Sequence, residues 1–320
     1  MEKNPLTNIQ EFIASRFDAA VISGHSVAVT LRREVVGATP QQIRVAIEGL
    51  ARLNPGNFAG NLHYTMIAGV KCGVVDYQGV KDERKRVIWS HGGGFAFGSA
   101  RVYKATATYL AKALKCEVII PEYRLSPEHK FPDAVDDLFT VYSEIVQQPG
   151  TTFLIGDSAG GNLAACLVAR CIATKTKIPT KLALLSPWMD LSKTSDSNLL
   201  NSSEFSPFDK LDAVAFARDY IGDMSDKDPL VSPLYGSFVG FPTSHVQASK
   251  VEYLYTDSVS TVNALKSAGV KVDTHWEPKA LHAWQLVPDL LPDAKRSMNA
   301  VADFFNFIKC NNINRYIHTL

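Results

Sequence analysis

The sequence predicts an α/β fold in which a mostly parallel sheet carries helices on both faces and a helical cap. Three observations predict it. From about residue 62 onward, short apolar runs alternate with helical stretches, which is the pattern of parallel strands joined by crossover helices. Residues 8–53 precede this region and have the spacing of two or three amphipathic helices. Residues 187–243 interrupt the alternation with clusters of Pro, Ser and Asp.

The elements follow in chain order. Thr39-Pro40 predicts a helix start, because threonine caps a helix and proline suits its first position. The candidate buried strands are 87–90, 117–121, 152–156, 181–186, 245–249 and 270–276. The candidate helices of the sheet region are 101–114, 133–147, 159–173, 257–268 and 293–309, and a further helix is expected at 210–221.

These elements indicate one domain over residues 1–320. Its cap would be formed by about residues 1–55 and by an insertion at about 187–243. We expect the insertion to lie over the carboxyl ends of the strands, where open α/β sheets bind ligands.

Composition excludes several classes of protein. With 320 residues, 46% apolar and 20% charged, and a net charge of +1, the chain has no basic field for nucleic acid. It has no 18-residue apolar run for a transmembrane segment, and residues 1–11 lack a signal-peptide core. We therefore expect a cytoplasmic protein. Clusters of Asp, Glu and His with ligand spacing are lacking in the sequence, so no metal and no organic cofactor is expected.

The five cysteines are odd in number and lack C-x-x-C spacing. This pattern favours reduced core residues rather than a disulfide framework or a metal site. Cys166 and Cys171 lie on the helix predicted at 159–173, where thiol reagents could reach them.

Residues 156–160, Gly-Asp-Ser-Ala-Gly, follow an apolar run and precede a helical stretch. A serine hydroxyl is a poor nucleophile, so it must be exposed next to a base, at the positive end of a helix. A strand, a sharp turn and a helix provide this, and small residues around the serine relieve the crowding of the turn. The segment therefore predicts Ser158 as a nucleophile.

Residues 91–95, His-Gly-Gly-Gly-Phe, follow the strand predicted at 87–90. Three consecutive glycines cost backbone entropy, so they are expected where the main chain closely approaches a ligand. In acyl transfer, main-chain N–H groups stabilise the tetrahedral oxyanion. We expect an oxyanion hole formed by the N–H groups of Gly92, Gly93 and Ala159, with His91 orienting the glycine loop.

Taken together, these two segments resemble the hormone-sensitive-lipase-like family of α/β-hydrolases, also called family IV bacterial esterases. Residues 123–128, Tyr-Arg-Leu-Ser-Pro-Glu, match a further family segment except at Ser126, where the family has alanine. Segments 186–191 and 228–234 also look like family segments. The resemblance covers roughly residues 60–310. It implies an α/β-hydrolase fold and a serine carboxylesterase that forms an acyl-enzyme.

The resemblance also implies a base at His282, after the last predicted strand. Histidine suits this role because its ordinary pKa lies near neutral pH. The supporting acid should lie between Ser158 and His282. Aligning the helix predicted at 257–268 with the family places it at Glu252, although the family's Gly-Ser before the acid is lacking here. Asp257 is the alternative, and otherwise would cap that helix.

The expected partner is a small-molecule ester with a short to medium acyl group, including lactones or acetylated alcohols. An amidase or deformylase with the same triad, or a non-catalytic ligand receptor on this scaffold, is the alternative. A homodimer through the last strand and the C-terminal helix is left open. Candidate substrate-binding residues are Phe95, Trp188, Met189 and Trp284, with Phe12, Phe17, Met66, Phe97, Phe205 and Phe208 as further wall candidates.

Overall fold

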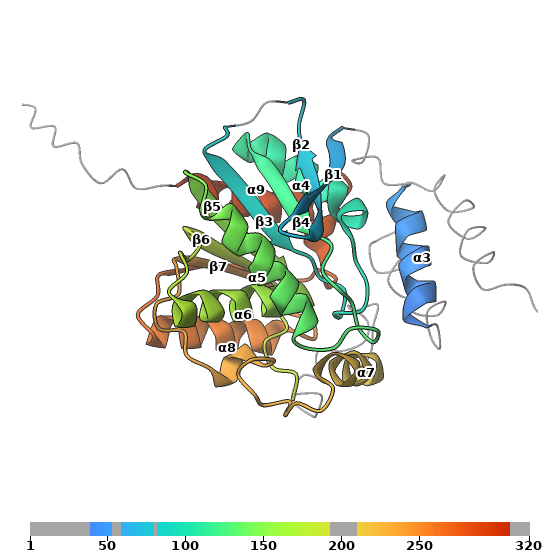
Figure 1. The fold of residues 1–320 in the computed structure, drawn as a ribbon, viewed down its shortest axis with the longest axis vertical. Coiled ribbons are helices and arrows are strands. Elements are labelled where there is room, and N and C mark those ends of the chain that lie inside the picture. The colour runs from blue at the N-terminus through green and yellow to red at the C-terminus, as the bar shows by residue number, and fades with distance from the viewer. Residues whose placement is uncertain (1–38, 53–58, 80–81, 193–209, 308–320) are drawn as a thin grey trace, which may run out of the picture.

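A computed structural model describes residues 39–52, 59–79, 82–192 and 210–307. Its centre is an eight-stranded sheet in the order β1-β2-β4-β3-β5-β6-β7-β8 (Figure 1). The strands from β4 to β8 pair in parallel, whereas β1 with β2 and β2 with β4 pair antiparallel. The strands are β1 (Asn61–Ile67), β2 (Val70–Asp76), β3 (Lys85–Ser90), β4 (Glu117–Pro121), β5 (Thr151–Asp157), β6 (Lys181–Leu185), β7 (Ser244–Ser249) and β8 (Val272–Glu277).

Helices cover both faces of this sheet. Those that the structure describes are α3 (Pro40–Ala51), α4 (Ala100–Leu114), α5 (Asp133–Ile145), α6 (Ala159–Thr174), α7 (Lys210–Ile221), α8 (Tyr255–Ser267) and α9 (Pro292–Asn306), with 3-10 turns η3 (Pro233–Tyr235) and η4 (Trp284–Leu286). Successive side chains of a strand point to opposite faces of the sheet, so the strands contribute to two separate buried clusters. Val87 and Trp89 pack with residues of α4 and α9, whereas Ile88 and Leu154 pack with residues of α5 and α6. The predicted fold class is confirmed.

The hairpin of β1 and β2 was not among the predicted strands. Strand β1 lies at the edge of the sheet, and all of its residues are exposed or half-buried. Ala68 and Gly69 turn the chain with positive φ angles of 47° and 87°, as tight hairpin turns require. The prediction relied on buried apolar runs, and an exposed edge strand does not have one.

Two described helices belong to the segments expected to form the cap. Helix α3 begins at Pro40, as predicted, and Thr39 Oγ1 accepts a hydrogen bond from Gln42 N at 3.3 Å. Helix α7 spans the predicted 210–221. Residues 1–38 and 193–209 lie outside the described residues, so the cap as a whole stays a prediction. In the part of the chain that the structure describes, no helix is both long enough and apolar enough to cross a membrane.

Candidate active site

Ser158 lies at the turn between β5 and α6. Its backbone has φ 52° and ψ −124°, an unusual conformation for a residue other than glycine. The glycines beside it make room for this turn. A Cβ at Gly156 would lie 2.4 Å from the Gly160 carbonyl oxygen, and one at Gly160 would lie 2.1 Å from that of Ser90. Only glycine therefore fits at positions 156 and 160, where the turn packs closely against neighbouring backbone. This close packing places Ser158 at the N-terminus of α6.

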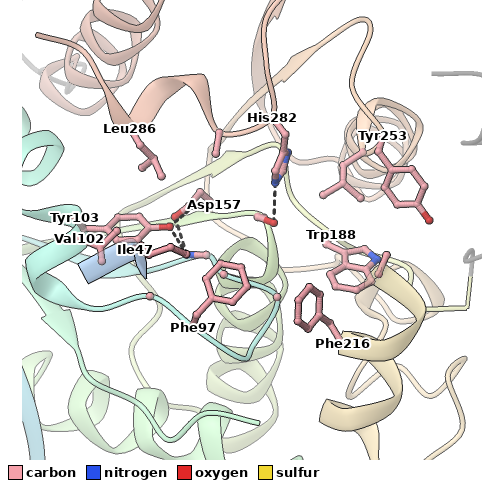
Figure 2. Close-up of a pocket in the computed structure, with 18 residues that line it drawn as sticks. Ile47, Phe97, Val102, Tyr103, Asp157, Trp188, Phe216, Tyr253, His282 and Leu286 are labelled. Atoms are coloured by element: carbon pink, nitrogen blue, oxygen red, sulfur yellow. Dashed lines mark hydrogen bonds between the residues drawn. The ribbon is translucent and has the colours of Figure 1, made fainter. Parts of the chain in front are cut away.

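A chain of hydrogen bonds joins three of the predicted residues. Ser158 Oγ lies 3.0 Å from His282 Nε2, and His282 Nδ1 lies 2.6 Å from Glu252 Oε2 (Figure 2 shows the first contact). Glu252 is fully buried, and its Oε1 accepts hydrogen bonds from Ser186 Oγ at 2.7 Å and Ser249 N at 2.6 Å. This geometry lets the imidazole accept the serine proton while the carboxylate holds the Nδ1–H tautomer.

Asp257, the alternative acid, has different contacts. Its Oδ2 accepts hydrogen bonds from the backbone N–H groups of Met189 and Asp190, at 2.9 and 3.0 Å. The side chain is buried in the first turn of α8, which begins at Tyr255. Asp257 therefore orders the loop after β6, and the capping role expected for it is corrected. The structure brings Glu252, five residues earlier, to the histidine.

The structure corrects one of the predicted oxyanion-hole donors, Gly92. The Gly92 N–H donates to Tyr103 Oη at 2.7 Å and to Asp157 Oδ1 at 3.0 Å, so it is not available to an oxyanion. Gly93 and Gly94 have positive φ angles of 120° and 58° and line the cavity beside Ser158. Within the described residues, the N–H groups of Gly93, Gly94 and Ala159 donate no hydrogen bond. The candidate donors are therefore these three.

The His91 side chain contacts the glycine loop and stabilises its conformation. Its Nδ1–H donates to the Gly92 carbonyl at 2.8 Å, and its ring stacks on Tyr123 with centroids 4.2 Å apart. Tyr123 Oη in turn donates to the His91 carbonyl at 2.5 Å. Burial lowers the pKa of His91 to about 4, so the ring is neutral at neutral pH. This neutral, buried ring contacts the loop and not the nucleophile.

A cavity of about 180 Å³ opens beside Ser158. Its walls are largely apolar, with Trp188, Phe216 and Tyr253 on one side of His282 and Val102 and Leu286 on the other (Figure 2). Ile47 comes from α3 and Phe216 from α7, so both described helices of the segments expected to form the cap contribute to the cavity wall. The described lining residues are Ile47, Gly92, Gly93, Gly94, Phe97, Gly98, Val102, Tyr103, Asp157, Ser158, Trp188, Ala213, Phe216, Tyr253, Leu254, His282, Ala283 and Leu286.

Of the predicted substrate-binding residues, Trp188 lines this cavity and the other three do not. Phe95 is fully buried and stacks on Tyr220 at 3.8 Å between ring centroids. Met189 is fully buried in the main core cluster. Trp284 packs in a small separate cluster beside α9, and its Nε1 donates to Ser297 Oγ at 3.0 Å. An aromatic or Met residue next to a motif can point into the core, and the motif does not show which way.

Among the further wall candidates, Phe97 lines the cavity, whereas Met66 is exposed on β1. Phe12, Phe17, Phe205 and Phe208 lie outside the described residues. Tyr253, Leu286 and Ile47 also line the cavity and were not predicted from the sequence. Tyr253 could have been found, because it directly follows the candidate acid. The others come from elements whose packing the sequence does not reveal.

Within the described ranges, no group of three or more His, Cys, Asp or Glu side chains is arranged to hold a metal ion. The four cysteines of those ranges, Cys72, Cys116, Cys166 and Cys171, are free and buried.

The parallel sheet, the strained serine after β5 and the histidine that faces it define an α/β-hydrolase. A family model described as alpha/beta hydrolase fold matches residues 87–286. An esterase of Acinetobacter venetianus is 31% identical over 269 residues, covering 83% of this chain and 88% of the relative. An acetyl-hydrolase of Streptomyces hygroscopicus is 28% identical over 227 residues, covering 70% and 76%.

Solved structures agree with these relatives. A crystal structure of an esterase from the bacterial hormone-sensitive lipase family is similar with a TM-score of 0.81 and 25% identity, covering 95% of this chain and 98% of that one. The chain belongs to the hormone-sensitive-lipase-like family of α/β-hydrolases, the family IV carboxylesterases. It is a carboxylic ester hydrolase.

Proposed function

We propose that this esterase works through a Ser158–His282–Glu252 triad and a covalent acyl-enzyme. The observation that carries the proposal is the pair of hydrogen bonds at 3.0 and 2.6 Å that link the three side chains. A serine held by a histidine, itself oriented by a buried carboxylate, is the arrangement that activates a hydroxyl for attack on a carbonyl.

In the proposed reaction, Ser158 Oγ attacks the ester carbonyl carbon while His282 Nε2 takes the hydroxyl proton. Glu252 keeps Nδ1–H oriented and stabilises the resulting imidazolium. The carbonyl oxygen becomes an oxyanion that accepts hydrogen bonds from the N–H groups of Gly93, Gly94 and Ala159. Collapse of this intermediate releases the alcohol, which receives the proton from His282. Water then attacks the acyl-enzyme in the same way and releases the acid.

We propose short to medium acyl esters, including acetylated alcohols and lactones, as the substrates. The cavity beside Ser158 measures about 180 Å³, which is below the range of about 300–1,000 Å³ typical of pockets for drug-sized ligands. Aromatic side chains of Trp188, Phe216 and Tyr253 bound one side of it. The name of the Streptomyces hygroscopicus relative, an acetyl-hydrolase, supports the same class.

We also propose that residues 1–320 form a single domain whose cap comprises about residues 1–55 and 187–243. The contributions of Ile47 from α3 and Phe216 from α7 to the cavity support this. In this arrangement the cap sets the size of the substrate, and the sheet carries the chemistry.

A chain-length series tests the substrate class. The protein should hydrolyse p-nitrophenyl acetate, butyrate and hexanoate with the highest kcat/KM and p-nitrophenyl laurate much more slowly. A matched p-nitroanilide of the best acyl group should react more slowly than its ester. A preference for acyl groups of about twelve carbons or more would contradict the size argument. Faster turnover of the anilide would favour the amidase alternative.

A further inference from the structure

We propose that Tyr103 is a positioning residue for the oxyanion hole: its hydroxyl, fixed by the Asp157 carboxylate, holds Gly92 so that the next two N–H groups of the glycine loop face the substrate. This role rests on the proposed function, because it concerns the same oxyanion. It concerns a residue of α4, outside both the glycine loop and the serine turn.

The Tyr103 hydroxyl is the middle member of a hydrogen-bond chain. It accepts the Gly92 N–H at 2.7 Å and donates to Asp157 Oδ2 at 2.6 Å (Figure 2). The Tyr103 side chain is nearly fully buried, with 3% of its surface exposed. Because the hydroxyl has one proton, its donation to the carboxylate leaves an oxygen lone pair for the Gly92 N–H. Its orientation is therefore fixed from both sides.

Asp157 connects this chain to the nucleophile, because it is the residue directly before Ser158. Its Oδ1 accepts hydrogen bonds from Trp89 Nε1 at 2.9 Å and from Gly92 N at 3.0 Å. Burial raises the pKa of Asp157, and the hydrogen bonds from Tyr103 and Trp89 oppose that rise. The donors thus satisfy a buried carboxylate that would otherwise be costly. The same carboxylate joins the loop and the turn that the reaction must align.

The main chain at Gly92 rests directly on this pair. A Cβ at Gly92 would lie 2.4 Å from Asp157 Oδ2 and 3.0 Å from Tyr103 Oη. A side chain at position 92 would therefore clash with this pair, and the two hydrogen bonds of the Gly92 N–H hold the loop against it. The N–H groups of Gly93 and Gly94 follow immediately, so their direction depends on where Gly92 is held.

The Tyr103 hydroxyl contributes more than packing. Its ring makes an edge contact with Trp89, with centroids 5.5 Å apart, and phenylalanine would keep that contact. Loss of the hydroxyl alone would deprive Asp157 of its shortest hydrogen bond and Gly92 of its shorter one. A displacement of catalytic donors by about 1 Å can lower the rate by about 100-fold, because the donors are aimed at the transition state rather than at the substrate.

The test is Tyr103→Phe, assayed with p-nitrophenyl butyrate and with a trifluoromethyl ketone that adds to Ser158 to form a tetrahedral oxyanion. We expect kcat to fall by about 10- to 100-fold while KM stays within about threefold. The inhibition constant of the ketone should rise by a factor similar to the fall in kcat. A merely structural role would not produce this joint change at an unchanged KM.

The matched control is Tyr142→Phe. Tyr142 is also buried, but its hydroxyl donates to the Lys177 carbonyl at 2.8 Å and does not line the cavity. The Tyr142→Phe variant should keep kcat and the inhibition constant of the ketone at wild-type values. If Tyr103→Phe does not fold, as judged by circular dichroism, Asp157→Asn takes its place and should show the same joint change in kcat and inhibition constant.

Unchanged kcat and an unchanged inhibition constant in folded Tyr103→Phe, or in folded Asp157→Asn if that variant replaces it, would overturn the positioning role. A fall in kcat with no weakening of the ketone would also overturn it, because the oxyanion would then not be the state affected. Wild-type protein that neither turns over esters nor reacts with a fluorophosphonate would contradict the proposed function as well. Active wild type beside an unaffected variant would overturn only the role of Tyr103.

Discussion

Glu252 Oε2 lies 2.6 Å from His282 Nδ1, and Glu252 has no exposed surface. The carboxylate is held on its other oxygen by Ser186 Oγ and by the backbone N–H of Ser249. A buried carboxylate with these partners has a fixed position, so it can fix the orientation of the imidazole ring. Asp257, by contrast, holds backbone N–H groups of a neighbouring loop.

This difference predicts an order of effects for two isosteric variants. Glu252→Gln should lower kcat by a factor on the order of 10³ or more, since the amide cannot stabilise the imidazolium and favours the wrong tautomer. Asp257→Asn should keep kcat within about tenfold and mainly lower the melting temperature, because it weakens buried hydrogen bonds of the loop. Steady-state kinetics and thermal melts of both variants check this. The opposite order of rates would contradict the assignment of the acid.

The position of α3 should depend on Arg44. Its guanidinium donates to the carbonyls of Ala96 at 2.6 Å and Ser126 at 2.8 Å, and it forms two hydrogen bonds with Glu128. Arg44→Ala should loosen the helix and the cavity wall at Ile47, raising KM about fivefold, equivalent to about 1 kcal/mol of lost apolar contact. The value of kcat should change little, because Ser158, Glu252 and His282 lie in the segments that follow β5, β7 and β8 and not on α3.

Two variants sharpen the Arg44 measurement. Arg44→Lys should restore KM only in part, since lysine keeps the charge but not the planar fork that reaches several acceptors at once. Arg84→Ala removes an exposed arginine that pairs with Asp82 and should leave both constants unchanged. If Arg44→Ala kept the wild-type KM for every ester, α3 would not set this wall of the cavity.

The buried His91 should make the protein less stable as the pH falls. Burial lowers the pKa of His91 to about 4, below the value of about 6.5 in an unfolded chain. Between these values the unfolded chain binds a proton that the folded protein does not, so the free energy of unfolding decreases as pH falls through this window. The full loss is about 3 kcal/mol, and the contribution is intact above about pH 6.5.

Urea unfolding at pH 7.5, 6.0 and 5.0 measures this effect. Wild type is compared with His91→Gln, which lacks the titrating ring. The variant is expected to be less stable at pH 7.5 but to lose less stability between pH 7.5 and 5.0 than wild type does. Other groups titrate in both proteins, so the difference between the two curves reports His91. Parallel curves would contradict the assignment of a neutral, buried ring.

The thiols of the described ranges should be unreactive in the folded protein. Burial raises the pKa of Cys72, Cys116, Cys166 and Cys171 to about 12 in each case. Because the thiolate is the reactive form, N-ethylmaleimide at pH 7.5 should leave these four unmodified without urea and label them with urea. Peptide mass spectrometry locates the adducts. Rapid native labelling of Cys166 or Cys171, the two that the sequence left accessible, would show that α6 is more open than the structure indicates.

Much of the fold could be predicted from the sequence, since buried parallel strands are short apolar runs between amphipathic helices. The strand predicted at 117–121 and the helix at 210–221 have the same bounds in the structure. The exposed edge strand β1 lacks that signal and was missed. The position of β4 between β2 and β3 also follows from pairing across the sheet, which local patterns do not record.

The candidate site likewise contains residues that the sequence predicts and residues whose roles depend on distant contacts. Ser158 could be predicted from its own segment, because the small residues around it serve a sharp turn between a strand and a helix, whereas His282 was predicted from the family resemblance. The sequence of three glycines does not show which N–H groups face the cavity, and Gly92 was assigned wrongly because its partners, Tyr103 and Asp157, are 11 and 65 positions away. The direction of Phe95 depends likewise on its stacking with Tyr220.

The most direct measurement is the reaction of wild type and Ser158→Ala with p-nitrophenyl butyrate and with a fluorophosphonate, followed by intact-mass analysis. Ser237→Ala, in an exposed loop, is the matched control. The account predicts that wild type and the control turn over the ester and gain one phosphonyl group. Ser158→Ala should retain its melting temperature, gain no phosphonyl group and lose activity by a factor on the order of 10⁴ or more. Folded Ser158→Ala with wild-type turnover would contradict the account.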